Sequence, residues 1–141
     1  MVSLPTDMLL PRKEKIWPVH DGHDYEIHWA EKIGDAWSNE IVLTDNAVDD
    51  SCPSLAFFDD GSTGVVWREG GNAGRVYYRG RKIESGVATW QSAAVLVTAG
   101  LGEDASVPWL VVHDQTPWIV WREIPSSGGD PHVMGGGADV P

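Results

Sequence analysis

The chain has 141 residues and a formal net charge of −11, from 21 acidic and 10 basic side chains. This charge argues against nucleic acid, whose binding depends on neutralising phosphates, and against anionic membrane surfaces. Cations and neutral polar ligands such as sugars stay compatible with it. The length fits one domain, and eight tryptophans with 16 glycines and 9 prolines favour many short strands over long helices.

Residues 1–24 form an N-terminal segment that we expect to lie outside the repeated part of the chain. The segment has no basic start followed by a long apolar run, so we read no secretory signal in it. No apolar stretch reaches the length of a membrane span. Cys52 is the sole cysteine, so no intrachain disulfide can form. These features predict a cytoplasmic protein.

From residue 25 onward the apolar pattern has a period of two, which is typical of strands, and no segment shows a sustained helical stripe. Glycine-rich and Asp-Gly turns separate the strands. Residues 124–141 are rich in Gly and Pro and form either a tail or an arm exchanged with a neighbour. The predicted strands are Tyr25–Lys32, Trp37–Thr44, Pro53–Phe58, Gly64–Glu69, Arg75–Lys82, Thr89–Thr98, Pro108–His113, Trp118–Glu123 and His132–Met134.

The strands belong to a unit that is written twice. The stretch Trp67-Arg68-Glu69 returns 54 residues later (121 − 67) as Trp121-Arg122-Glu123. A period near 50 indicates a propeller blade or a solenoid unit. In such a unit Val66 should face one side of its sheet and Val65 and Trp67 the other, with the tryptophans packed between blades. Further matches are Pro53–Ala56 with Pro108–Val111, Ile41–Thr44 with Val95–Thr98, Trp37 with Trp90, and Lys32-Ile33 with Lys82-Ile83.

The order of these signals resembles the blades of sialidase-like (Asp-box, BNR-type) propellers over residues 25–123. A strand ending in Tyr-Arg or Trp-Ala leads to a Gly turn, a Trp, a run ending in Leu-Thr or Val-Thr, an acidic loop, then Pro-x-Leu and a Val-Val-Trp strand. The Asp-box Ser-x-Asp-x-Gly-x-Thr-Trp is reduced to a Gly and a Trp in residues 33–37, and to a Gly and Thr-Trp in residues 84–90.

This resemblance implies an all-β fold of propeller-like, four-stranded antiparallel blades, about two per chain. Two blades cannot close a ring, so we expect a homo-oligomer, a trimer giving six blades. The front half-blade Pro108–Glu123 of one chain would complete the back half-blade Tyr25–Thr44 of a neighbour. A dimeric four-bladed ring, a monomeric β-sandwich of two similar sheets and a piece of a longer protein are the alternatives.

Sialidases use an arginine triad, a Tyr–Glu nucleophile pair and an acid–base Asp. The candidates here lie in no motif of that family, so we assign no catalytic residue and expect a non-enzymatic, lectin-like module that binds carbohydrate. A sialidase-like glycoside hydrolase relative and a protein-binding scaffold are the alternatives. The candidates considered are Arg68, Arg75, Arg79, Arg81, Arg122, Tyr77 and Tyr78.

Acidic residues stand just before the prolines that open the inner strands. A carboxylate that accepts sugar hydroxyls, beside an aromatic face that covers the ring, is a common way to hold a neutral sugar. The structural alternative is a solvated acidic turn with an Arg68/Glu69 ion pair. The predicted ligand-binding residues are Asp49, Asp50, Arg68, Glu69, Glu103, Asp104 and Trp109.

Metal binding has weaker support in the sequence, and we expect no cofactor. The acidic loops offer oxygen ligands for Ca²⁺, but they lack a repeated Asp-x-Asp-x-Asp ladder. The run His20-Asp21-Gly22-His23-Asp24 resembles a metal cluster, yet its histidines have no His or Cys companion at a familiar spacing. Solvation of a polar loop is the favoured interpretation of that run.

Overall fold

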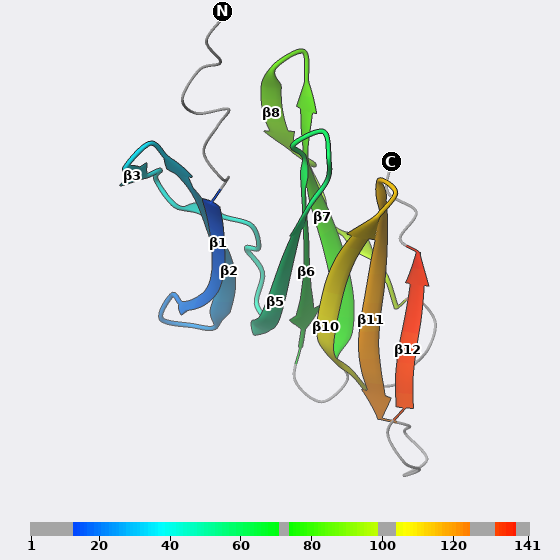
Figure 1. The fold of residues 1–141 in the computed structure, drawn as a ribbon. Coiled ribbons are helices and arrows are strands. Elements are labelled where there is room, and N and C mark those ends of the chain that lie inside the picture. The colour runs from blue at the N-terminus through cyan, green and yellow to red at the C-terminus, as the bar shows by residue number, and fades with distance from the viewer. Residues whose placement is uncertain (1–12, 71–73, 99–103, 125–131, 138–141) are drawn as a thin grey trace, which may run out of the picture.

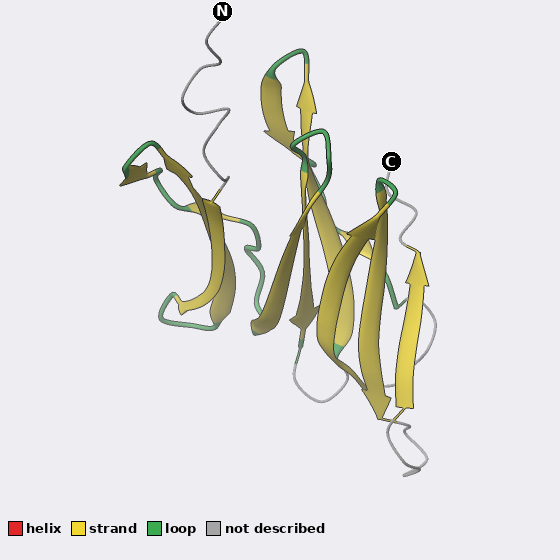
Figure 2. Ribbon diagram, viewed as in Figure 1, coloured by secondary structure: helices red, strands yellow, loops and turns green. Residues whose placement is uncertain are grey.

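The computed structural model describes residues 13–70, 74–98, 104–124 and 132–137. In these ranges the chain is built of antiparallel β-strands and contains no helix, as Figure 2 shows, so none of the described residues forms a membrane-spanning helix. The strands form three sheets that stand side by side (Figure 1). The expected all-β antiparallel fold is therefore confirmed. A sandwich of two sheets does not describe this arrangement.

Sheet A comes first in the chain. It contains β1 (Lys13–His20), β2 (Tyr25–Ile33), β3 (Ala36–Trp37) and β4 (Ile41–Val42). β1 pairs with one edge of β2, and the short strands β3 and β4 both pair with the other edge. The sheet thus extends into the segment 1–24 that the sequence left outside the repeat.

Sheets B and C follow with the predicted strands, at shifted bounds. Sheet B contains β5 (Asp50–Phe57), β6 (Thr63–Glu69), β7 (Arg75–Glu84), β8 (Val87–Trp90) and β9 (Val95–Leu96), the last two on one edge of β7. Sheet C contains β10 (Asp104–His113), β11 (Thr116–Ile124) and β12 (His132–Gly137). Within sheet B, β5 is the inner strand, β6 the second, β7 the third, and β8 with β9 the outer strand.

The hydrophobic core lies between the sheets. Val65 and Trp67 pack toward sheet A with Ile27 and Trp29, whereas Val66 packs toward sheet C with Leu110 and Trp121, among other residues. The alternation predicted for β6 is confirmed. Trp67 and Trp121 are both buried, so each fills an inter-sheet space rather than offering a free face to a ligand.

Backbone hydrogen bonds show that sheets A and B are copies of one unit. The Leu43 amide donates to the Ile27 carbonyl in sheet A, and the Val97 amide donates to the Val76 carbonyl in sheet B, both at 2.8 Å. In each copy the next residue is a threonine whose hydroxyl accepts the amide of that same Ile27 or Val76. The offset is therefore 49 residues in the third strand (76 − 27) and 54 in the outer strand (97 − 43).

This register corrects one detail of the sequence alignment. Lys32 pairs with Trp37, and Arg81 pairs with Trp90, so Lys32 corresponds to Arg81 and not to Lys82. The β7–β8 hairpin continues for two residue pairs beyond the point where the β2–β3 hairpin ends. Identical Lys-Ile letters in the two copies therefore stand at different structural positions.

Sheets B and C share a further irregularity. The β5–β6 pairing slips between Ser51 and Ser54, and the β10–β11 pairing slips between Ser106 and Trp109. At each slip a Ser-x-Pro sequence places a non-glycine residue in the left-handed region, with φ of 51° at both Cys52 and Val107. A bulge repeated with the same backbone conformation supports the repeat independently of sequence identity.

The three sheets differ in which strands they possess. Trp17 in β1, Trp67 in β6 and Trp121 in β11 each lie on a second strand paired with the third strand of its sheet. Among the described residues sheet A thus has second, third and outer strands, and sheet C has inner, second and third strands. The half-blades expected at the two ends are larger than predicted. In the described residues, β1 and β12 take the places beside β2 and β11 that the predicted exchange of half-blades assigned to strands of a neighbour.

Candidate functional site

A cavity of about 520 Å³ opens between sheets B and C at their upper end in Figure 1. Three chain segments form its walls: the β5–β6 turn, the end of β7 with its hairpin, and the β10–β11 turn. Its volume is in the range of small-molecule sites. The principal polar and aromatic residues lining it are Phe58, Asp60, Ser62, Tyr78, Lys82, Glu84, Gln115 and Thr116.

Glycines create the room for the aromatic floor of this cavity. A Cβ at Gly64 would lie 2.9 Å from the ring and the hydroxyl of Tyr78, and 3.0 Å from Leu110. A Cβ at Gly80 would approach the same hydroxyl to 3.3 Å. Burial raises the pKa of Tyr78 to about 12, so its phenol stays protonated at neutral pH and can donate a hydrogen bond.

The turns that form the rim are tied to one another. The Asp59 amide donates to Gln115 Oε1 at 2.8 Å, which links the β5–β6 turn to the β10–β11 turn. The β10–β11 turn has positive φ at Asp114 and Gln115, the backbone of a two-residue hairpin loop. The Ser62 amide donates to Asp60 Oδ1 at 2.8 Å within the other turn. The rim is therefore held in a defined shape.

The cavity brings together an ammonium group, two carboxylates, a carboxamide and hydroxyls, supplied by Lys82, Asp60, Glu84, Gln115 and Thr116. Such a mixture can donate to and accept from several hydroxyls of a neutral polar ligand. The sequence analysis considered Tyr78 and Arg81, which both line the cavity, but not the other lining groups. The sequence did contain one indication of the cavity: the turns at 59–62 and 115–117 are equivalent in the repeat, so both lie at the same end of adjacent sheets.

The predicted ligand-binding residues Arg68 and Asp104 lie at the opposite, lower end of the same two sheets. Arg68 Nη2 is 2.8 Å from Asp104 Oδ1, Nε donates to the Ala105 carbonyl at 3.0 Å, and Nη1 donates to the Gly70 carbonyl. Burial opposes the ionised form of Asp104, but hydrogen bonds from Arg68 and the Gly74 amide, and the charge of Arg68, lower its pKa overall. The pair ties sheet B to sheet C, and Arg68 pairs with Asp104 rather than with Glu69.

Asp49, Asp50 and Glu69 lie at the lower end between sheets A and B. Asp50 is fully buried opposite Glu69, and Asn46 Nδ2 donates to its Oδ2 at 2.9 Å. Burial raises the pKa of Asp50 to about 7 and also raises the pKa of Glu69. Asp49 is exposed and accepts the Tyr25 amide through Oδ1 at 3.0 Å.

The two remaining predicted ligand-binding residues, Trp109 and Glu103, belong to neither of these two pairs. Trp109 is 63% exposed on the face of sheet C that points away from sheet B. Glu103 lies outside the described residues. The structure therefore brings Arg68 together with Asp104, and Asp50 with Glu69, but places none of the predicted residues at the cavity.

Arg79 and Arg81, like Arg68, connect neighbouring sheets. Arg79 donates to the carbonyls of Leu43 and Gln91, both at 2.7 Å, and burial lowers its pKa. Arg81 Nη2 is 3.2 Å from Glu31 Oε1, and its guanidinium lies 4.8 Å from the centre of the Trp29 ring. No group of three arginines converges on one point in the contacts of the described residues, as an arginine triad would require.

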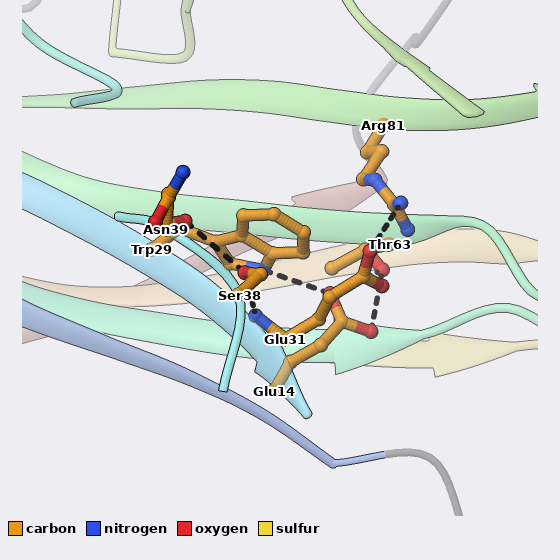
Figure 3. A network of polar contacts seen from close by, with 7 residues as sticks. All are labelled: Glu14, Trp29, Glu31, Ser38, Asn39, Thr63 and Arg81. Atoms are coloured by element: carbon orange, nitrogen blue, oxygen red, sulfur yellow. Dashed lines mark hydrogen bonds and ion pairs between the residues drawn. The ribbon is translucent and has the colours of Figure 1, made fainter. Parts of the chain in front are cut away.

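Figure 3 shows how this arginine joins a network between sheets A and B. Glu14 Oε1 accepts the Trp29 indole N–H at 2.8 Å and the Thr63 hydroxyl at 2.9 Å. Ser38 Oγ accepts the Glu31 amide at 3.1 Å. The network connects β1, β2 and β6, and it satisfies polar groups around a buried tryptophan.

Comparison with known proteins gave no match. No protein-family model matches the chain, and neither the curated proteins nor the solved structures contain a significant match to it.

Proposed function

We propose that this chain is a non-enzymatic module that binds a neutral carbohydrate in the cavity between sheets B and C. The observation that carries the proposal is the cavity itself, with its tied rim and its mixed lining of hydroxyl, carboxylate, carboxamide and ammonium groups. Phe58, which is half-buried, supplies the aromatic surface on which the apolar face of a sugar ring can lie, and the buried Tyr78 forms part of the cavity floor. Lys82 and Glu84 would then bind hydroxyls at the mouth.

A sialidase-like hydrolase is the alternative function, and the contacts of the arginines favour binding over catalysis. Arg68, Arg79 and Arg81 each use the guanidinium to connect strands or sheets. A substrate carboxylate would have to displace those bonds. A neutral sugar held by hydrogen bonds does not require such a displacement.

The proposal includes a propeller-like assembly, supported by two open faces. The face of sheet C that points away from sheet B exposes Trp109, Trp118, Val120 and Val133. In the repeat, Val120 corresponds to Val66, which is 0% exposed beneath sheet C. Sheet C therefore presents to solvent the same face that sheet B buries, and a further sheet would cover it.

We infer that a second copy of the chain supplies that sheet through sheet A. The outer face of sheet A carries Trp17, which corresponds to the buried Trp67, with Lys15 Nζ 4.7 Å from the centre of its ring. Head-to-tail packing of two chains would give six sheets. The trimer expected from the sequence assumed about two blades per chain, whereas the structure has three sheets.

Binding can be tested with a glycan array followed by calorimetry on any glycan that binds. We expect Lys82→Ala and Glu84→Gln to weaken binding about tenfold, because each removes one hydrogen-bonding group. Lys32→Ala, a lysine of sheet A, serves as the matched control and should leave affinity unchanged. Binding of no neutral glycan, or equal affinity in all variants, would overturn the proposal. Fluorogenic glycosides should hydrolyse at the rate in buffer, and a faster rate would favour the hydrolase.

A further inference from the structure

Three carboxylates converge at the lower end of sheet A, away from the cavity. One oxygen each of Asp21, Asp24 and Glu26 lies within 4.8 Å of the other two. Asp24 is 7% exposed and Glu26 is 3% exposed, whereas Asp21 is open to solvent in the β1–β2 turn. Negative groups at this spacing and burial repel one another unless a proton or a cation lies between them.

Two buried carboxylate oxygens at this place lack a hydrogen-bond partner. Asp24 Oδ2 and Asp50 Oδ1 are both inaccessible to solvent and unpartnered. Asp50 belongs to sheet B and is linked to Glu26 through Asn46, whose amide donates to Glu26 Oε1 and whose Nδ2 donates to Asp50 Oδ2. Buried polar atoms are nearly always satisfied, and an unsatisfied carboxylate oxygen indicates a missing partner.

At the lower end of the interface between sheets B and C, an arginine is the partner of a carboxylate. Between sheets B and C the Arg68 guanidinium lies among the strand ends and pairs with Asp104. The register places Pro18 of sheet A at the position of Arg68. At this lower end, the interface between sheets B and C thus contains a paired arginine, whereas no lysine or arginine of the described residues pairs with Asp24 or Glu26.

The ligand oxygens are already oriented. Glu26 Oε1 accepts the Asn46 amide at 3.0 Å, and Oε2 accepts the Thr44 hydroxyl. Asp21 Oδ1 accepts the amides of His23 and Asp24 at 2.8 and 3.1 Å. These bonds hold the carboxylates in place without a cation, so little ordering is needed for one to bind.

We propose that Asp21, Asp24 and Glu26 form a Ca²⁺-binding site in sheet A, next to the facing sheet B. The donors are all oxygens, which suits Ca²⁺ better than Zn²⁺. Two oxygens that bind one Ca²⁺ at about 2.4 Å lie at most about 4.8 Å apart, whereas Mg²⁺ at about 2.1 Å requires a tighter set. The cation would supply at this end of sheet A the positive charge that Arg68 supplies between sheets B and C. The site is independent of the proposed sugar binding.

The test is binding of Ca²⁺ to the full chain after treatment with EDTA, measured by calorimetry, with Tb³⁺ luminescence as a second probe. We expect one Ca²⁺ per chain, a higher melting temperature with Ca²⁺ than with EDTA, and displacement of Tb³⁺ by Ca²⁺. Asp21→Asn and Asp24→Asn should each weaken Ca²⁺ binding about tenfold or more, because each removes a ligand charge. Asp35→Asn, an exposed residue in the β2–β3 turn, is the matched control.

Asp21 is exposed, so its variant remains informative even if Asp24→Asn does not fold. Absence of saturable binding at millimolar Ca²⁺ would overturn the site. So would equal Ca²⁺ affinity in wild type, Asp21→Asn and Asp35→Asn. Binding of Zn²⁺ without binding of Ca²⁺ would also contradict it, because the histidines of the turn would then be the ligands. None of these results depends on sugar binding.

Discussion

Two valines at equivalent repeat positions provide a direct test of the stacked sheets. Val66 and Val120 occupy the same place in β6 and β11, but Val66 is 0% exposed and Val120 is 39% exposed. Replacing Val66 by Ala removes two buried carbon groups, about 0.8 kcal/mol each, and leaves a cavity. We expect Val66→Ala to lower the free energy of unfolding by about 2–3 kcal/mol. Val120→Ala in an isolated chain should cost about 0.5 kcal/mol.

The assay is urea unfolding followed by tryptophan fluorescence at two protein concentrations. Val66→Ala should lose the same free energy at both concentrations, since its contacts lie within one chain. Val120→Ala should cost more at the higher concentration if a second copy covers sheet C. The reasoning is refuted if Val66→Ala costs no more than Val120→Ala at the lower concentration, because the two positions would then not differ in burial within one chain.

Three further predictions follow from single contacts. Gly64→Ala should destabilise the chain by about 1–3 kcal/mol in thermal unfolding, because the new Cβ meets two buried side chains, and a neutral effect would contradict the close packing there. Arg68 lowers the pKa of Asp104, so the pair stabilises the fold above the ordinary carboxyl pKa and loses that contribution as pH falls. Arg68→Ala should therefore reduce the loss of unfolding free energy at acid pH. An unchanged loss at acid pH would contradict the pairing. Val107 has a left-handed φ that glycine adopts without strain, so Val107→Gly should leave the stability unchanged or raise it by up to about 1 kcal/mol. Val111→Gly on the same strand is the control and should destabilise the chain by about 1 kcal/mol. Equal losses of stability for the two variants in a thermal melt would argue against the bulge.

The strands were predictable where β-branched and aromatic residues follow one another between turns. β6 is buried on both faces and burial alternates along β11, and their repeated Trp-Arg-Glu ends determined the offset of 54 residues. β1 was missed because Lys13, Glu14, Lys15 and Pro18 conceal its alternation. Its second-strand Trp17 becomes recognisable as a repeat only through the register with β2.

A three-residue pattern predicts a structural feature that recurs in the repeat. Ser-x-Pro marks the bulge in both β5 and β10, and the same letters stand once more at residues 3–5, outside the described residues. The Lys-Ile match, in contrast, was off by one position because a hairpin differs in length. Sequence identity alone does not report such a shift.

The sites were less predictable because each combines separate units. The cavity joins turns of two sheets, and its tie from Asp59 to Gln115 spans residues far apart in the chain. The cluster of three carboxylates includes Glu26, which the sequence did not connect with Asp21 and Asp24. Only the structure shows that β2 brings Glu26 to the same end of the sheet as the two aspartates. The acidic candidates at Asp50 and Asp104 were noticed for their charge, but burial and pairing with other groups decide what they do.

The most direct test of the account is the absolute molar mass in solution, measured by light scattering during gel filtration over a range of concentrations. Head-to-tail packing of sheet C on sheet A of a second copy predicts twice the 15.4 kDa of one chain at high concentration. Trp109→Asp, which places a charge on the open face of sheet C, should return the mass to one chain. A wild-type mass of one chain at every concentration would contradict the assembly.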